Sequence, residues 1–215
     1  MAAKLSADAA LSAVCQVLED ECPENRGFCI IRPPGHHAHA ARNHGFCFLN
    51  NVALQAQLAA ALGKKVLIFD WDIHQGDGTG TIFYESDQVM LMSLHRYDDR
   101  GFFPARPDGA ASYVGRNAGA GYNVNVAWNT GSWGRSELGS NEYRLACEEA
   151  LLPIAKEFNP DLILVSCGFD SAIHDQLGGA NLCPLGYYWM TRELLKICPK
   201  MIVVLEGGYN TDYLG

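Results

Sequence analysis

Six short apolar runs, separated by helical patterns and loops, are the feature that most constrains how this chain can fold. They are rich in β-branched and aromatic residues, and most are continuously apolar instead of alternating with polar residues. Strands of this kind are covered on both faces, as in a parallel sheet between layers of helices. The runs are residues 28–31, 65–69, 89–94, 122–127, 162–167 and 201–205.

Helical patterns alternate with these runs. They cover residues 8–20, 46–62, 141–157 and 184–197, and Pro184 is well placed in a first helical turn. Alternation of strands and helices predicts an α/β fold, here three α/β/α layers around a mainly parallel central sheet. A chain of 215 residues can bury one sizeable core, so we expect a single domain over residues 1–215.

The charge and cysteine content exclude several classes of protein. Lys and Arg number 16 against 24 Asp and Glu, a net charge of −8, so neither nucleic acid nor an anionic membrane is an expected direct partner. The eight cysteines form no C-x-x-C motif and no signal peptide precedes them, which predicts reduced thiols in a nuclear or cytoplasmic protein. No apolar run approaches the roughly 20 residues of a membrane helix.

Loops rich in Gly, Asp, His and Pro follow the predicted strands. Ligands of open α/β sheets collect outside the carboxyl ends of the strands, so these loops are the expected location of any chemistry. The loops are residues 32–45, 70–80, 96–121, 168–181 and 206–210.

The loop after the second strand carries a candidate metal site. Asp70, Asp72 and His74 alternate, so in extended backbone they project to the same side. Carboxylate and imidazole ligands suit Zn²⁺, although an Asp-Gly turn with a solvated acidic loop is the alternative. Either Asp170 or Asp175, after another buried strand, could complete a site that keeps one position open for water.

Two further elements carry candidate catalytic groups. A rigid Pro-Pro-Gly turn precedes His36, His37 and His39, which favours a general base; adventitious metal binding or structural loop histidines are the alternatives. Tyr209 follows paired glycines at a strand end, where it is either a catalytic phenol or a packed aromatic residue.

Five motifs occur in an order that resembles the zinc-dependent histone deacetylases of the arginase/deacetylase fold. The segments R-P-P-G-H-H and N-V-A-W are most similar to the corresponding segments of the class II branch. The resemblance runs from about residue 8 to the C-terminus and implies a catalytic domain that is incomplete at both ends. The motifs are R-P-P-G-H-H-A at 32–38, G-F-C-F-L-N-N at 45–51, D-W-D-I-H-Q-G-D-G-T at 70–79, S-L-H-R-Y at 93–97 and L-E-G-G-Y-N at 205–210.

The resemblance implies a role for each residue that matches a motif. Zinc would be held by Asp72, His74 and Asp175. His36 and His37 would face the attacking water, with His37 as general base and then acid. The remaining roles are Asp70 behind His36, Asp77 behind His37, Tyr209 as donor to the acetyl oxygen, and Asp70, Ser93 and Phe83 around a structural potassium ion.

The resemblance also implies a substrate slot. Gly45, Phe46 and Phe103 would line the passage for the lysine stem, and Leu182 stands where polyamine-selective relatives carry an acid. Gln75, His174 and Gly80, together with Gln176 next to Asp175, depart from the family pattern without removing a ligand.

The expected function is therefore zinc-dependent removal of acetyl groups from lysine in histones or other proteins. The expected partners are an acetylated protein substrate and a corepressor or cytoskeletal protein, in the nucleus or cytoplasm. A weakly active or inactive interaction subunit is the alternative. An arginase-like hydrolase is a third possibility, which would need a two-metal carboxylate cluster and would not use Tyr209.

Overall fold

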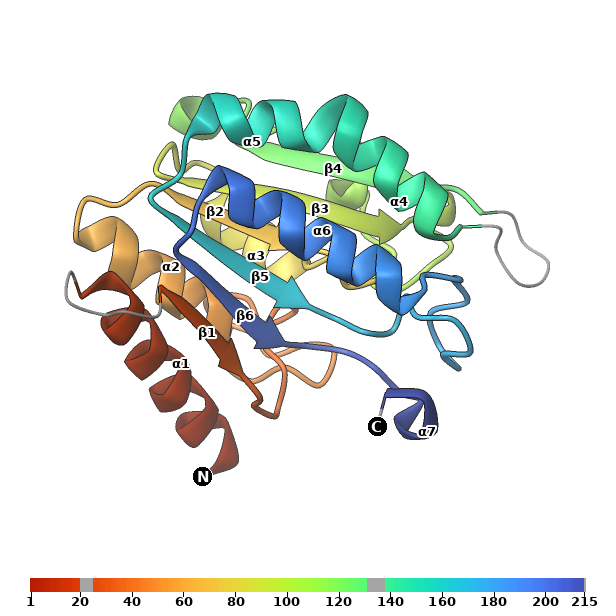
Figure 1. The fold of residues 1–215 in the computed structure, drawn as a ribbon, viewed down its shortest axis with the longest axis horizontal. Coiled ribbons are helices and arrows are strands. Elements are labelled where there is room, and N and C mark those ends of the chain that lie inside the picture. The colour runs from red at the N-terminus through yellow and green to blue at the C-terminus, as the bar shows by residue number, and fades with distance from the viewer. Residues whose placement is uncertain (20–24, 131–137, 215) are drawn as a thin grey trace.

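A computed structural model describes residues 1–19, 25–130 and 138–214. Its centre is a six-stranded sheet in the order β1-β6-β5-β2-β3-β4, and every neighbouring pair of strands is parallel (Figure 1). The parallel sheet expected from the apolar runs is confirmed. The strands are β1 (Arg26–Cys29), β2 (Val66–Asp70), β3 (Val89–Arg96), β4 (Asn123–Trp128), β5 (Leu162–Cys167) and β6 (Met201–Leu205).

Helices cover both faces of the sheet. The helices α1 (Ala2–Leu18), α2 (Asn51–Ala61) and α3 (Asp77–Phe83) pack on one face, while α4 (Ser140–Ala146), α5 (Leu152–Phe158) and α6 (Pro184–Ile197) pack on the other (Figure 1). A short helix, α7 (Thr211–Leu214), follows β6. Within the described ranges, no helix combines the length and apolar character needed to cross a membrane.

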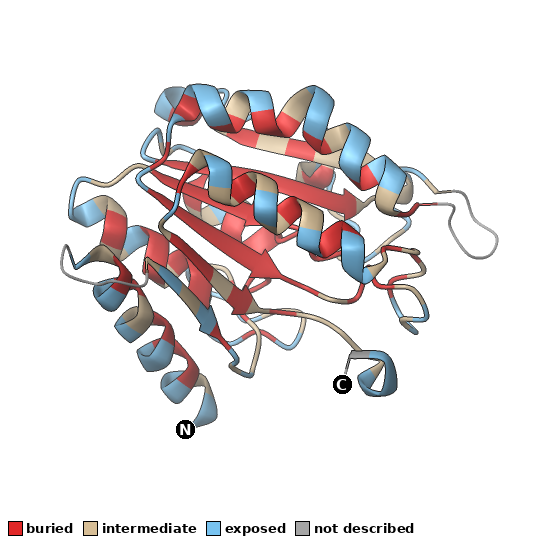
Figure 2. Cartoon of the chain, in the orientation of Figure 1, coloured by how far each residue is buried: buried red, intermediate tan, exposed pale blue. Residues whose placement is uncertain are grey.

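The central strands show why their sequences are apolar throughout. Along β2, Leu67 and Phe69 belong to the core under α4, α5 and α6, while Val66 and Ile68 belong to the core under α1 and α2. Successive side chains of a strand point to opposite faces, so a strand covered on both faces needs apolar residues at every position. Figure 2 shows these buried strands between helices whose outer faces are exposed.

The helix expected over residues 141–157 is interrupted. A π-helical turn at Cys147–Leu151 joins α4 to α5. Pro153, in the first turn of α5, has no N–H to donate, and in a regular α-helix its ring would clash with the carbonyl four residues earlier. The wider π-helical turn before α5 accommodates the proline. The helix expected over residues 46–62 begins only at Asn51, because the Asn50 side chain caps it by accepting from the Ala53 N–H.

Helix α3 was not expected, because its sequence Asp-Gly-Thr-Gly has low intrinsic helix propensity. The cysteines in the described ranges are free thiols and most are buried, as expected. Cys22 and the predicted end of the first helix at residue 20 lie outside the described residues.

Because all six strands are parallel, their carboxyl ends meet at one edge of the sheet. The central order β5-β2-β3 places Asp70 opposite Ser166 on one side and Ser93 on the other. The loops that follow β2, β5, β6 and β1 therefore converge at this edge, although they are far apart in sequence.

Candidate metal and catalytic site

The structure brings three ligand-bearing side chains together at the carboxyl edge. Asp72 and His74 follow β2, and Asp170 follows the neighbouring strand β5. The His74 Nδ1 lies 2.9 Å from an Asp170 carboxylate oxygen and 3.2 Å from one of Asp72. One ligand atom of each residue lies within 4.8 Å of the other two, and all three residues are buried. We call these residues the Asp72 group.

Among the described residues the structure groups Asp170, and not Asp175, with Asp72 and His74, so the third-ligand role of Asp175 stays a prediction. The Asp175 carboxylate instead accepts the backbone N–H groups of Leu177, Gly178 and Tyr209, at 2.8, 3.0 and 2.8 Å. Asp170 lies three residues beyond the end of β5, much as Asp72 lies two residues beyond the end of β2.

The Asp72 group fits a zinc ion. Two carboxylates and one imidazole are three protein ligands, which is the number that leaves a fourth position for water in a catalytic zinc site. The backbone is also shaped around these ligands. A Cβ at Gly168 would lie 2.1 Å from an Asp72 oxygen, and a Cβ at Gly207 would lie 2.4 Å from one of Asp170. Glycine at both positions therefore leaves room for the carboxylates to converge.

The charges of the Asp72 group also favour a cation. Burial and the neighbouring Asp72 charge raise the pKa of Asp170 to about 7. Burial acts to lower the pKa of His74, but hydrogen bonds to Asp170 and Asp72 outweigh it and raise that pKa to about 10. Although burial opposes it, the charge of His36 and contacts with His74 hold the pKa of Asp72 well below its usual range. Buried carboxylates this close together require positive charge between them.

The two adjacent histidines each contact a different buried carboxylate. The His36 Nδ1 lies 3.1 Å from Asp70, and the His37 Nδ1 lies 2.8 Å from Asp77. These are the pairs expected from the sequence. The two imidazole rings are 4.0 Å apart, and the His36 Nε2 lies 3.8 Å from an Asp72 oxygen, so the pair borders the Asp72 group.

The two histidines differ in protonation. Burial acts to lower the pKa of His36, but the charges of Asp72 and Asp70 raise it well above the usual value. Burial and the adjacent His36 charge lower the pKa of His37 to about 4. His37 is therefore neutral near pH 7. Its Nδ1–H donates to Asp77, which leaves the Nε2 lone pair available as a base.

Glu206 is a site residue that the sequence reasoning missed. It follows β6 directly and is buried, and its Oε2 accepts the N–H groups of Gly35 and His36 at 2.7 and 3.1 Å. It thereby ties the end of β6 to the histidine loop. Burial raises its pKa to about 7. The sequence feature that could have predicted it is an acidic residue directly after an apolar strand, in the same motif as Tyr209.

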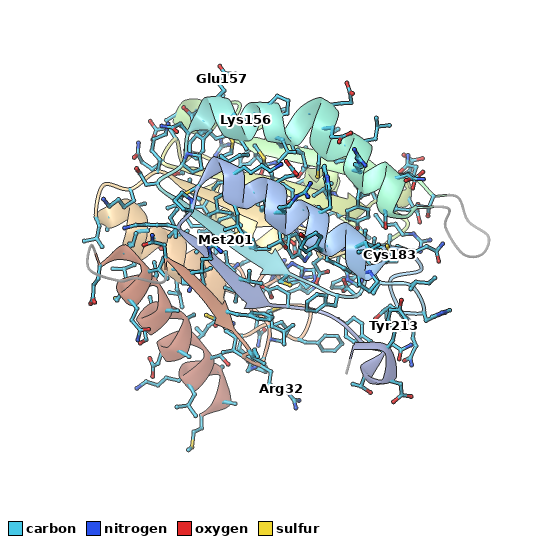
Figure 3. The ribbon with its side chains drawn as sticks, in the orientation of Figure 1. Arg32, Lys156, Glu157, Cys183, Met201 and Tyr213 are labelled. Atoms are coloured by element: carbon cyan, nitrogen blue, oxygen red, sulfur yellow. The ribbon has the colours of Figure 1, made fainter. Side chains whose placement is uncertain are left out.

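Tyr209 stands at the edge of the site, half-buried. Its backbone N–H is held by Asp175, and the carbonyl of His174 accepts from the Asn210 side chain. The ring of Tyr213 in α7, a residue labelled in Figure 3, lies 5.4 Å from that of His174. Burial and the charges of Asp72 and Asp170 raise the pKa of the Tyr209 phenol. The hydroxyl is therefore protonated at neutral pH and can donate a hydrogen bond.

Aromatic rings border the opening of the site. Phe103, which is 42% exposed, lies 5.0 Å from the ring of His37, and Phe102 stacks on His74 at 4.9 Å. Gly45 packs so closely on His37 that a Cβ would lie 2.4 Å from the ring. Phe46 is 71% exposed, with a positive φ of 66°. Gly45 and Phe103 therefore border the candidate base directly, and Phe46 presents an apolar ring to solvent.

The prediction that Leu182 lines the substrate slot is wrong. Its side chain is fully buried in the core, and its N–H donates to the Ser171 carbonyl. It cannot contact a substrate. The exposed apolar residue of this loop is Leu177, two residues beyond Asp175.

The residues predicted around potassium are spread over two layers. Asp70 and Ser93 are register partners on β2 and β3. Phe83 ends α3 and packs into the core under α1 and α2. Potassium at Asp70, Ser93 and Phe83 stays a prediction.

Comparisons with known proteins show which sequences this chain resembles. A family model described as "Histone deacetylase domain" matches residues 1–215. Histone deacetylase 5 of Arabidopsis thaliana is 43% identical over 98% of this chain and 32% of its own length. The polyamine deacetylase HDAC10 of Danio rerio is 40% identical over 99% of this chain and 31% of its own length.

A solved structure matches the fold. The crystal structure of the HDA15 HD domain superposes with a TM-score of 0.92 and 42% identity, over 99% of this chain and 59% of that one. This confirms the three-layer arginase/deacetylase fold. The chain spans about a third of the length of the two curated relatives above. Since the family model matches the whole chain and a solved deacetylase domain shares its fold, the chain belongs to the histone deacetylase domain family.

Proposed function

We propose that this chain is a zinc-dependent hydrolase that removes acetyl groups from lysine side chains of proteins. The observation that supports this most strongly is the Asp72 group beside the neutral, Asp77-bound His37. A three-ligand metal site next to an uncharged imidazole is the combination that metal-assisted amide hydrolysis needs. The named activities of the relatives are consistent with it.

Three side chains would carry the reaction. A zinc ion held by Asp72, His74 and Asp170 would polarise the acetamide carbonyl and lower the pKa of water towards about 7. His37 Nε2 accepts the proton of the attacking water, while Asp77 holds the opposite ring nitrogen. The Tyr209 hydroxyl donates to the oxygen that gains negative charge. His37 then returns its proton to the leaving amine, and acetate and free lysine depart.

The surroundings support this assignment. Asp70 and Glu206 hold His36 and its backbone, so the histidine loop is anchored from two strands. Phe103, beside His37, supplies an apolar wall for the lysine stem. We propose acetyl-lysine over acetylated polyamine because the exposed residue of the loop near Tyr209 is the apolar Leu177, which offers no charge to a second amine.

The test is acetate release from an acetyl-lysine peptide by the purified, zinc-loaded chain, with an acetylated polyamine as the competing substrate. We expect turnover of the peptide, and a loss of about 10²-fold or more in Tyr209→Phe. Bound zinc without turnover of either substrate contradicts the proposal and supports the inactive interaction subunit. Manganese-dependent hydrolysis of a guanidino compound supports the arginase-like alternative.

The proposed function includes the expected partners, the localisation and a structural potassium ion. An acetylated protein is the proposed partner, together with a corepressor or cytoskeletal protein, in the nucleus or cytoplasm. Structural potassium belongs with them. Measuring turnover in potassium and in sodium salts of equal ionic strength tests the ion directly, and equal rates contradict it.

A further inference from the structure

A second group of histidines surrounds the carboxylate of Asp77, which is fully buried. One oxygen lies 2.8 Å from the His37 Nδ1. The other lies 2.9 Å from the His39 Nε2 and 3.4 Å from the His44 Nδ1. We call these four residues the Asp77 cluster. All three histidines come from the loop after β1, and Asp77 comes from the first turn of α3.

One nitrogen of the Asp77 cluster is unsatisfied. The His44 Nδ1 is buried and has no hydrogen-bond partner within the described part of the chain, although it faces the Asp77 carboxylate. A buried polar atom without a partner destabilises the folded state, because it has lost its hydrogen bonds to water. A ligand that bridges His44 and Asp77 would remove this cost.

The geometry suits a metal ion as that ligand. One ligand atom each from His37, His44 and Asp77 lies within 4.8 Å of the other two. Two imidazoles and a carboxylate are donors that zinc accepts. The side chain of His44 is 32% exposed, so the Asp77 cluster extends to the surface of the molecule.

We propose that His37, His44 and Asp77 form a second, weaker zinc site, which fills only when zinc exceeds one ion per chain. It is weaker because it has one carboxylate where the Asp72 group has two. It is weaker also because the Arg106 Nε lies 3.7 Å from an Asp77 oxygen and repels a cation. Arg106 keeps two close contacts with Asp108, at 2.7 and 3.0 Å, so it has another partner when an ion occupies Asp77.

Occupation of this site has a consequence that rests on the proposed function. An ion that takes the His37 Nδ1 and the Asp77 carboxylate breaks the hydrogen bond that orients His37 as a base. The deacetylase would then be inhibited by excess zinc.

The test is zinc binding measured by equilibrium dialysis of the whole chain, followed by metal analysis. We expect a second, weaker equivalent of zinc in the wild-type chain. His44→Gln removes a direct ligand and should weaken this second equivalent by more than about tenfold, the smallest loss usual for residues that only orient a ligand, and leave the first unchanged. The matched control is His174→Gln, an exposed histidine of another loop, which should keep both equivalents.

Several outcomes contradict the proposal. They are a single equivalent in the wild-type chain, equal binding of the second equivalent by wild type and His44→Gln, or a loss in His174→Gln as large as in His44→Gln. Thermal unfolding of each variant separates a lost ligand from a lost fold.

A second variant separates this proposal from the proposed function. Asp170→Asn removes a ligand of the Asp72 group and should lose the first equivalent while keeping the one at His44. If the second equivalent depends on His44 but the chain shows no turnover, the second site holds and the deacetylase function fails. If turnover occurs without a second equivalent, the reverse is true.

Discussion

Asp72 and Asp77 are five residues apart, in the loop after β2 and in the first turn of α3, yet the Asp72 group and the Asp77 cluster suit different chemistry. The Asp72 group joins two carboxylates to one imidazole, and its carboxylates form ion pairs with His36 and His74. The Asp77 cluster joins one carboxylate to three imidazoles and has Arg106 nearby. The balance of negative charge decides which of them holds a cation tightly and which one orients a base.

The pKa values of the carboxyl groups differ between the two regions in the same way. The carboxylate of Asp77 faces three histidines. Burial acts to raise its pKa, but hydrogen bonds and charges of His37 and His39 outweigh burial and lower the pKa to about 2. The pKa of Asp170, which faces another carboxylate, is instead raised. Asp77 is thus ionised at neutral pH without a metal, whereas burial and the Asp72 charge oppose the ionisation of Asp170, which a bound cation would favour.

The largest expected effect comes from removing a carboxylate of the Asp72 group. Asp170→Asn should abolish tight zinc binding and acetate release, because the amide is a poor replacement for an anionic ligand. Asp175→Asn, the matched control in the same loop, should retain the zinc. Metal analysis after dialysis measures both, and tight zinc that persists in Asp170→Asn but is lost in Asp175→Asn would support Asp175 as the third ligand.

Removing the carboxylate of the Asp77 cluster should reduce turnover but spare the tightly bound zinc. We expect Asp77→Asn to lower turnover by about 10²-fold, within the range that a positioned general base contributes. Steady-state kinetics and zinc content measure the two effects. If the tight zinc is lost as well, the division between the two regions is wrong.

Asp175 provides a smaller test, since it contacts the backbone of Tyr209 and neither region directly. Asp175→Ala removes the carboxylate that accepts the backbone N–H groups of Leu177, Gly178 and Tyr209. We expect turnover to fall by about tenfold, the equivalent of one to two hydrogen bonds that no longer position the phenol. In a Tyr209→Phe background the same change should have almost no effect on turnover. Equal losses in both backgrounds would contradict positioning through Tyr209.

His95 offers a third kind of buried histidine, without a carboxylate hydrogen bond. Its ring contacts the Ser93 hydroxyl and the Gly109 carbonyl. Burial lowers its pKa from 6.5 to about 4, although the Gly109 hydrogen bond acts to raise it. The unfolded chain therefore binds more protons between these values. The free energy of unfolding is unaffected by His95 above pH 6.5 and decreases as the pH falls towards 4, by at most about 3 kcal/mol.

Urea unfolding of the wild type and His95→Gln across this pH range measures the effect. The difference between the two should change with pH only below the unfolded pKa of histidine. A constant difference would show that the folded pKa of His95 is ordinary, and that burial alone does not separate it from the carboxylate-bound histidines.

Much of the fold could be predicted because its signals are local. The six strands were expected within two residues of their observed bounds, since continuous apolar runs mark strands buried on both faces. The contacts of His36 with Asp70 and of His37 with Asp77 followed from the motifs. The interruption before Pro153 and the late start of α2 were missed, because each depends on a local detail of proline geometry or capping.

The site residues divide along the same line. Spacing within one loop is a property of the sequence, so Asp72 and His74 could be paired without a structure. The choice between Asp170 and Asp175 could not be made this way, because the path of that loop involves a long-range contact, in which the Tyr209 N–H donates to the Asp175 carboxylate 34 residues earlier. The burial of Leu182 depends on the same path.

By itself, the sequence determined the parallel α/β fold, the edge of the sheet that carries the site and the kinds of ligand found there. Strand burial and alternation depend on neighbouring residues, which is why they can be read directly from the chain. Only the tertiary structure decided that Asp170 joins the Asp72 group, that Glu206 anchors the histidine loop, and that His44 faces Asp77. These contacts join residues from different strands and loops, and packing of the whole chain sets the distances between them.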